Sequence, residues 1–261
     1  MLLPRLSFFT LLFALLWSAP VVAGVQKPVP LFLQENLDAQ GRQMPADPKL
    51  MDILSYFERK TGLKFAPVIL PWKRAQAETL RGEGIIYGFS RSVERLKKYD
   101  FSESVISEGV WAITYGHPKP VYKTVDDLRG KVVGIGRGFS HGLEFDQARD
   151  KIFTVQEDSA STAARFKKLL MGRSDLMLWP VRQYETSREV ENYINQVVIG
   201  DTHDAELMHR RFEVSDRPLF FDTVHFAAAK GQYQEVLRKV DKAILAGRKN
   251  GSLARVLRDY H

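Results

Sequence analysis

Helical and extended patterns alternate along most of this chain, and that alternation limits the possible folds more than any other feature. Apolar residues over 50–57 fall at helical spacing and stop before Gly62, which suits a helix end. Short apolar runs with strand character follow at 64–70 and 84–88, on either side of a second helical pattern at 72–80. Such alternation predicts an α/β fold with a mainly parallel sheet.

A second series of the same kind follows a strand pattern at 110–115. It predicts strands at 131–135, 153–156, 174–179 and 197–200, separated by helices at 125–128, from about 141, at 161–171 and at 181–193. The strand pattern at 223–230 and the helices after it, 232–246 and 252–260, have no partner in this series, so we assign them to the first. We therefore predict two lobes: 24–112 with 215–261 as lobe 1, and 113–214 as lobe 2.

The first residues, 1–23, have the pattern of a cleaved export signal. Arg5 supplies a positive charge, an apolar stretch covers 6–17, and small residues stand at 21–23. The apolar stretch is about 12 residues long, short of the ~20 needed for a membrane-spanning helix. With 0 cysteines, the chain has no disulfide, no thiolate chemistry and no lipid-modified cysteine. We therefore expect an unanchored periplasmic protein.

Composition and motif spacing argue against several other classes of protein. The net charge is +7, but the basic residues are interleaved with acids, so no nucleic-acid partner is expected. The 6 histidines show no metal-binding spacing. Gly134, Gly136 and Gly138 do not complete a dinucleotide fingerprint, because position 139 is Phe. We expect no metal and no cofactor.

Residues 87–102 combine features that can hold an anion. An apolar strand runs into Gly88 and Ser90, and a charged turn or short helix carrying Arg95 follows. Open backbone N–H groups and hydroxyls at a strand's carboxyl end, with a guanidinium nearby, suit an anion.

Further short motifs accompany this segment in a fixed order. They are Pro71-Trp72-Lys73-Arg74, Asp127-Leu128-Arg129-Gly130-Lys131-Val132-Val133-Gly134, Gly138-Phe139-Ser140, Leu169-Leu170-Met171-Gly172-Arg173-Ser174-Asp175 and Phe226-Ala227-Ala228-Ala229-Lys230-Gly231. Over most of 64–261 the chain thereby resembles bacterial extracellular solute-binding proteins of family 3, the amino-acid type. The resemblance implies a two-lobed periplasmic-binding-protein-like (type II) fold, with a ligand cleft that closes by a hinge.

The resemblance also implies roles for individual residues. A forked guanidinium contact would hold the ligand carboxylate, a geometry that lysine cannot reproduce. The turn at 138–140 would close over the same carboxylate from lobe 2, and Trp72, Phe89 or Trp111 could form an apolar wall. The candidate ligand-binding residues are Arg95, Ser90, Gly88, Phe89, Ser140, Phe139, Gly138, Trp72, Trp179 and Glu35.

Two departures from the family pattern bear on the ligand. Members that bind α-amino acids usually place an Asp, which holds the ligand ammonium, where this chain has Pro180. The usual aromatic-proline pocket loop is replaced by Phe32-Leu33-Gln34-Glu35-Asn36, in which Glu35 could supply a replacement acid. An unpaired buried ammonium would cost several kcal/mol. The departures weaken the expectation of an ordinary α-amino acid and favour an amino-acid-like or organic acid.

Three functions fit these observations. The leading one is a monomeric binding protein without catalysis that captures a small carboxylate-bearing solute for an ABC-type transporter and its inner-membrane permease. The second is a sensory or accessory protein of the same fold. The third is a periplasmic dehydratase-like enzyme, in which Glu35, Glu108 or Glu144 would have to face the cleft as a general acid.

Overall fold

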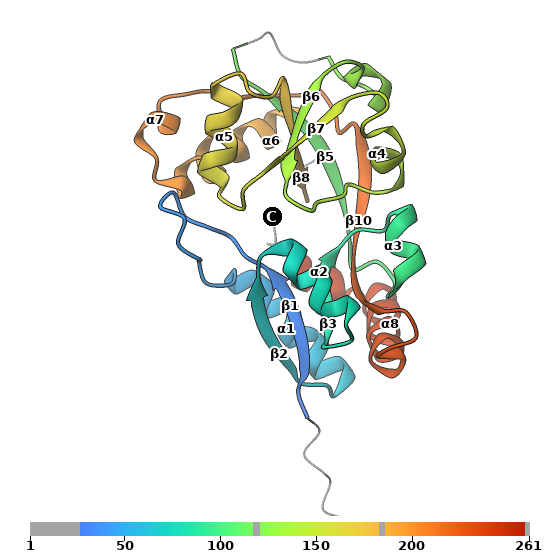
Figure 1. Cartoon of the computed structure of the whole chain (residues 1–261). Coiled ribbons are helices and arrows are strands. Elements are labelled where there is room, and N and C mark those ends of the chain that lie inside the picture. Colours follow the sequence, from blue (N-terminus) through green and yellow to red (C-terminus); the bar gives the residue numbers. More distant parts are fainter. Residues whose placement is uncertain (1–26, 117–120, 183–185, 259–261) are drawn as a thin grey trace, which may run out of the picture.

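The computed structural model describes residues 27–116, 121–182 and 186–258, which form two α/β lobes joined by long strands (Figure 1). The predicted export signal lies outside the described residues. Among those described, no helix combines the length and apolar character needed to cross a membrane.

The first lobe is built around three parallel strands. Its elements are β1 (Val29–Gln34), α1 (Pro48–Thr61), β2 (Phe65–Leu70), α2 (Trp72–Leu80), β3 (Ile85–Phe89), α3 (Val93–Lys98) and β4 (Tyr99–Phe101). β1 pairs in parallel with both β2 and β3. The carboxyl ends of these parallel strands therefore point the same way, towards the second lobe (Figure 1). Ligands of α/β sheets usually bind at this edge.

Helix α1 shows why the local pattern was readable. The Asp47 side chain caps its first turn by accepting from the Lys49 backbone N–H, and Gly62 ends it with a φ of 71°. Its apolar stripe, including Ile53 and Phe57, is buried in the first-lobe core.

The second lobe repeats the alternation. It contains a 3₁₀ turn (Val125–Leu128), β6 (Val132–Gly136), α4 (Leu143–Ala148), β7 (Thr154–Asp158), α5 (Thr162–Leu170), β8 (Leu176–Val181), α6 (Ser187–Asn192), α7 (Ala205–Met208) and β9 (Glu213–Val214). β6 lies between β7 and β8 and is parallel to both. With the long strands β5 (Ile106–Thr114) and β10 (Phe220–Ala229) included, the strand order is β2-β1-β3-β10-β5-β8-β6-β7.

Two strands, β5 (Ile106–Thr114) and β10 (Phe220–Ala229), run antiparallel from one lobe into the other. Within β10, Phe220 packs in a second-lobe core, whereas Phe226 packs in the first-lobe core. After β10 the chain ends on the first lobe with α8 (Gln234–Lys249) and α9 (Ser252–Leu257), where α8 packs against α1. The lobe limits predicted above stay a prediction.

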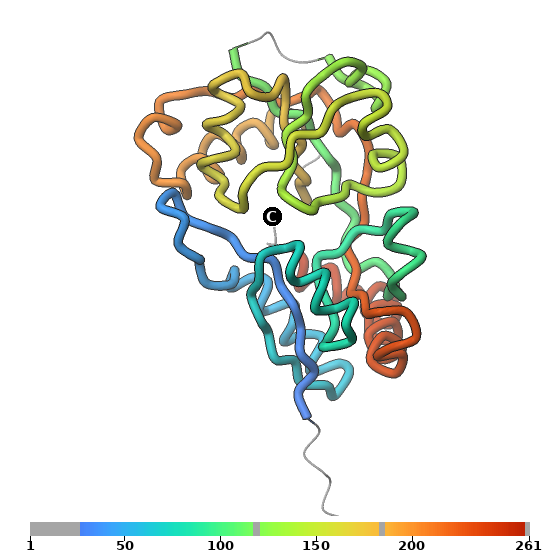
Figure 2. The backbone as a smooth tube through the Cα atoms, viewed as in Figure 1, coloured from blue at the N-terminus to red at the C-terminus, as the bar shows by residue number. Residues whose placement is uncertain are grey.

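The segment after β1 leaves the first lobe and reaches the second (Figure 2). Leu37 forms an isolated bridge with Ser161, and the Ser161 hydroxyl donates to Asp38 O at 3.2 Å. The lobes are therefore in contact away from the crossing strands.

The strand predicted at 197–200 is wrong. The chain there continues from α6 as a π-helical turn (Tyr193–Val198) and a 3₁₀ turn (Gly200–Thr202). Val198 and Ile199 are buried in the second-lobe core, so these β-branched residues mark a buried helical face. The predicted helix at 181–193 is also too long, because Val181 belongs to β8.

Candidate functional site

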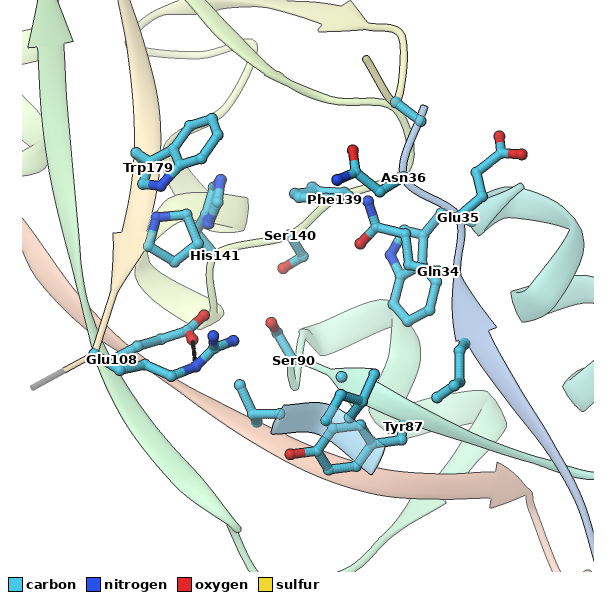
Figure 3. Close-up of a pocket in the computed structure, with 18 of the residues that line it drawn as sticks. Gln34, Glu35, Asn36, Tyr87, Ser90, Glu108, Phe139, Ser140, His141 and Trp179 are labelled. Atoms are coloured by element: carbon cyan, nitrogen blue, oxygen red, sulfur yellow. Dashed lines mark ion pairs between the residues drawn. The ribbon is translucent and has the colours of Figure 1, made fainter. Parts of the chain in front are cut away.

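A cavity of about 350 Å³ lies between the lobes and receives side chains from both (Figure 3). Its lining includes the predicted residues Glu35, Trp72, Gly88, Ser90, Arg95, Phe139, Ser140 and Trp179. Two predicted residues do not line it: Phe89 is fully buried beneath it, and Gly138 lies at its edge, in a neighbouring depression. The predicted contacts with a ligand stay predictions.

Arg95, on α3, links the two lobes. Its Nη1 donates to Ser90 O and its Nη2 to Gly138 O, each at 2.9 Å. The guanidinium carbon lies 4.0 Å from the centre of the Phe89 ring. Arginine has five N–H donors, so three remain for a ligand.

Arg95 keeps its positive charge at neutral pH although it is partly buried. Burial lowers the pKa of Arg95 to about 10, and Asp146 and Asp222 act in the opposite direction. At pH 7 only about one molecule in a thousand would be neutral. The side chain is therefore a fixed cation at the edge of the cavity.

The first lobe forms the floor of the cavity. Gly88 adopts a φ of 87°, in the left-handed region that favours glycine, and is exposed at the carboxyl end of β3. Ser90 is 7% exposed and faces the cavity in Figure 3. Trp72 begins α2 and meets Phe89 edge-on, with ring centroids 5.8 Å apart.

The second lobe covers the cavity with the turn that precedes α4. The Ser140 hydroxyl donates to Asp146 Oδ2 at 2.7 Å and accepts from Gly142 N at 3.2 Å. The same hydroxyl is thus engaged within its own lobe. Gly138 O accepts from Gln76 Nε2 of α2 at 3.0 Å as well as from Arg95, so this turn fastens the second lobe to the first.

Sequence reasoning missed two further arginines that line the cavity, Arg165 and Arg182. Arg165 is on α5, is 7% exposed, and its guanidinium lies 4.7 Å from the ring of Trp179. Burial lowers the pKa of Arg165 to about 10, with Asp158 opposing the shift. In the sequence this residue is one more polar position in a helical pattern, and no local signal marks it.

His141 also lines the cavity, although it is not among the predicted ligand-binding residues. It is 2% exposed, and burial with three nearby arginines lowers its pKa to about 3. It is therefore neutral at physiological pH. The part of the chain that the structure describes holds no group of three or more acids and histidines able to bind a metal ion.

The two acids that line the cavity, Glu35 and Glu108, are turned away or already paired. Glu108 pairs with Arg182, with Nε and Oε2 3.0 Å apart. The Glu35 carboxylate points away from the centre of the cavity in Figure 3. Glu144 is exposed and is not part of the lining. Pro180, which stands where amino-acid-binding relatives have Asp, is part of the lining.

Asp222, on the crossing strand β10, is the acid with the most altered titration near the site. It is 4% exposed, and burial raises its pKa to about 7, with the Ser90 hydroxyl opposing this shift and Glu108 adding to it. Its Oδ1 accepts from Thr223 N at 2.7 Å. Its charge therefore changes near neutral pH, beside Ser90.

Comparison with solved structures identifies the fold. The GluR0 ligand-binding core from Nostoc punctiforme in complex with (L)-glutamate superimposes with a TM-score of 0.65 at 14% identity, covering 89% of this chain and 99% of that chain. An ancestral arginine-binding protein bound to arginine gives 0.64 at 18% identity, covering 89% and 97%. The fold is therefore that of two-lobed amino-acid-binding proteins.

The sequence identifies the family. Residues 50–261 match bacterial extracellular solute-binding proteins, family 3, and the chain belongs to that family. The L-cystine-binding protein TcyJ of Escherichia coli (strain K12) is 32% identical over 104 residues, or 40% of this chain. That match spans only 38% of the relative's length.

Proposed function

We propose that this protein captures a small carboxylate-bearing solute in the periplasm and delivers it to an ABC-type transporter, without chemical conversion of the ligand. Family membership supports the solute-binding role. The export-signal pattern at 1–23 supports the periplasmic location.

One observation carries the choice of a carboxylate. Arg95 is a charged guanidinium at the interlobe cavity, bonded to one carbonyl of each lobe and with donors to spare. A ligand anion there would touch both lobes at once, so binding would favour the closed arrangement. Among the described residues, no carboxylate forms an ion pair with the partly buried Arg95 side chain, so a ligand anion would supply its counter-charge.

The surroundings support an acid over an ordinary α-amino acid. Pro180 offers no charge, and the Glu35 carboxylate is turned away. Glu108 is already paired with Arg182. Among the described residues that line the cavity, no free carboxylate faces a ligand ammonium.

A thermal-shift screen of the mature chain, 24–261, tests the proposal. The panel holds organic acids, keto acids, amino acids and amines. A ligand at 100 times its Kd should stabilise the fold by about 2.7 kcal/mol, a rise in Tm of about 5–10 °C. We expect hits among carboxylates and none among amines. A panel in which only amines stabilise the protein would overturn the proposal.

A further inference from the structure

Arg165, another arginine that lines the cavity, makes fewer hydrogen bonds with the described residues than a buried guanidinium normally does. Its Nη2 makes a long hydrogen bond of 3.3 Å to Leu178 O. Its Nε is buried and has no hydrogen-bond partner among the described residues. Buried polar groups are normally satisfied, and an unsatisfied charged one is costly.

No protein carboxylate in the described part neutralises Arg165. Asp158 is close enough to raise its pKa, but that carboxylate lies 2.6 Å from Lys168 Nζ. The aromatic rings of Trp179 and Phe139 flank the guanidinium, with its carbon 4.7 Å and 5.9 Å from their centres. The rings hold the cation in place without cancelling its charge.

Among the described residues, two cations of the cavity form no ion pair with a carboxylate. Arg182 and Glu108 compensate each other, which leaves Arg95 and Arg165. Both line the same cavity, and both lower the pKa of His141. Phe139 lies beside each of them, since Arg95 bonds to Gly138 O and Arg165 faces the Phe139 ring.

We propose that Arg165 binds a second acidic group of the ligand, so that the cavity selects a small dianion carrying two carboxylates. One carboxylate contacts Arg95 from the first lobe, and the other contacts Arg165 from the second. This inference rests on the proposed function, because it adds a second anchor to the same site. Arg165 would then make the protein prefer a diacid to a monoacid of the same chain length.

The test compares acids that differ only in the second carboxylate. Isothermal titration measures glutarate against pentanoate, and adipate against hexanoate, on the wild-type protein. Charge-assisted hydrogen bonds are the strong ones, so we expect the better diacid to bind at least about 30-fold more tightly than its matched monoacid. Equal affinities within both pairs would overturn the inference without any variant.

Three variants locate that preference. Arg165→Met keeps roughly the length of the side chain and should reduce the diacid preference to within about 3-fold. Arg165→Lys keeps the charge but not the fork and should give an intermediate preference. Arg173→Met removes the same charge from an exposed position after α5 and should leave the preference intact.

The outcomes separate this inference from the proposed function. If monoacids and diacids bind equally and both depend on Arg95, the proposed function stands and the role of Arg165 fails. If no carboxylate binds, the proposed function fails as well. A diacid preference that persists in Arg165→Met also overturns the inference. The unliganded Tm of each variant shows that it is folded.

Discussion

Arg95 and Arg165, the cavity arginines that form no ion pair among the described residues, differ in how their own lobes hold them. Arg95 on the first lobe makes two hydrogen bonds of 2.9 Å, one to each lobe, above the ring of Phe89. Arg165 on the second lobe makes one of 3.3 Å, beside the ring of Trp179. Burial lowers the pKa of both to about 10. The first is held by hydrogen bonds from both lobes without a ligand, whereas the second would gain its partners from the ligand proposed above.

The largest effect is expected from removing the arginine that joins the lobes. Arg95→Met should weaken every carboxylate that the wild type binds by at least about 100-fold, because a charge-assisted fork and an interlobe bond are lost together. Isothermal titration measures the loss. Arg74→Met removes the same charge from an exposed residue of α2 and should change affinity by less than about two-fold.

A smaller loss of affinity is expected from a change in the turn whose Gly138 carbonyl accepts a hydrogen bond from Arg95. Gly138 has a φ of 77°, and a Cβ there would lie 2.8 Å from Lys73 Cγ of the first lobe. Gly138→Ala should therefore strain the closed arrangement and weaken binding by about 10-fold. Gly172→Ala is the matched control, since it has a φ of 65° with open space around its Cβ. It should lower the Tm and leave the affinity unchanged; equal losses of affinity in both variants would contradict a closure role.

The acid between the lobes gives a pH-dependent prediction. Because burial raises the pKa of Asp222 from 3.8 to about 7, the folded protein loses stability as pH rises from about 4 to about 7. Asp222→Asn removes this loss, so its Tm should exceed that of the wild type by roughly 9–17 °C at pH 8 and by little at pH 4. Calorimetry across this range measures the difference.

Two buried histidines have the opposite effect on the pH dependence of stability, in the wild type and in Asp222→Asn alike. The pKa of His141 is lowered to about 3 and that of His225 to about 4, so each destabilises the fold as pH falls below 6.5. Subtracting the wild-type curve from the Asp222→Asn curve removes their contribution. A difference that does not grow with pH would contradict the raised pKa of Asp222.

The smallest effect is expected from the exposed contact between the lobes. Lys73 and Glu157 form an ion pair of 2.7 Å, with the lysine side chain 59% exposed. Exposed pairs contribute at most about 1 kcal/mol, so Lys73→Met should weaken ligand binding by less than about 5-fold. A loss as large as that of Arg95→Met would mean that surface charge, and not the cavity, controls closure.

Sequence patterns predicted an element correctly where its own residues, such as the apolar face of a helix and the residue that ends it, determine the structure. Helix α2 has the predicted bounds, 72–80, and the α1 stripe ends at Gly62 as expected. The pattern failed at 197–200, because buried β-branched residues look alike on a strand and on a helical face. Only packing against the second-lobe core separates the two.

The first-lobe part of the site was readable for a related reason. Gly88, Ser90 and Arg95 lie within one strand-turn-helix unit, so their proximity is local. Arg165 and Trp179 come from α5 and β8, and they meet only because the second-lobe sheet brings those elements together. No local sequence pattern predicts such a pair, because an arginine in a helical pattern without a motif is typical of the exposed face of a helix.

The most direct test of an anion held between two cations is a crystal structure of the protein with the diacid that binds most tightly. We expect one carboxylate about 3 Å from the free N–H groups of Arg95 and the other at a similar distance from Arg165. A diacid that lies in the cavity with neither carboxylate on Arg95 would contradict the proposed site.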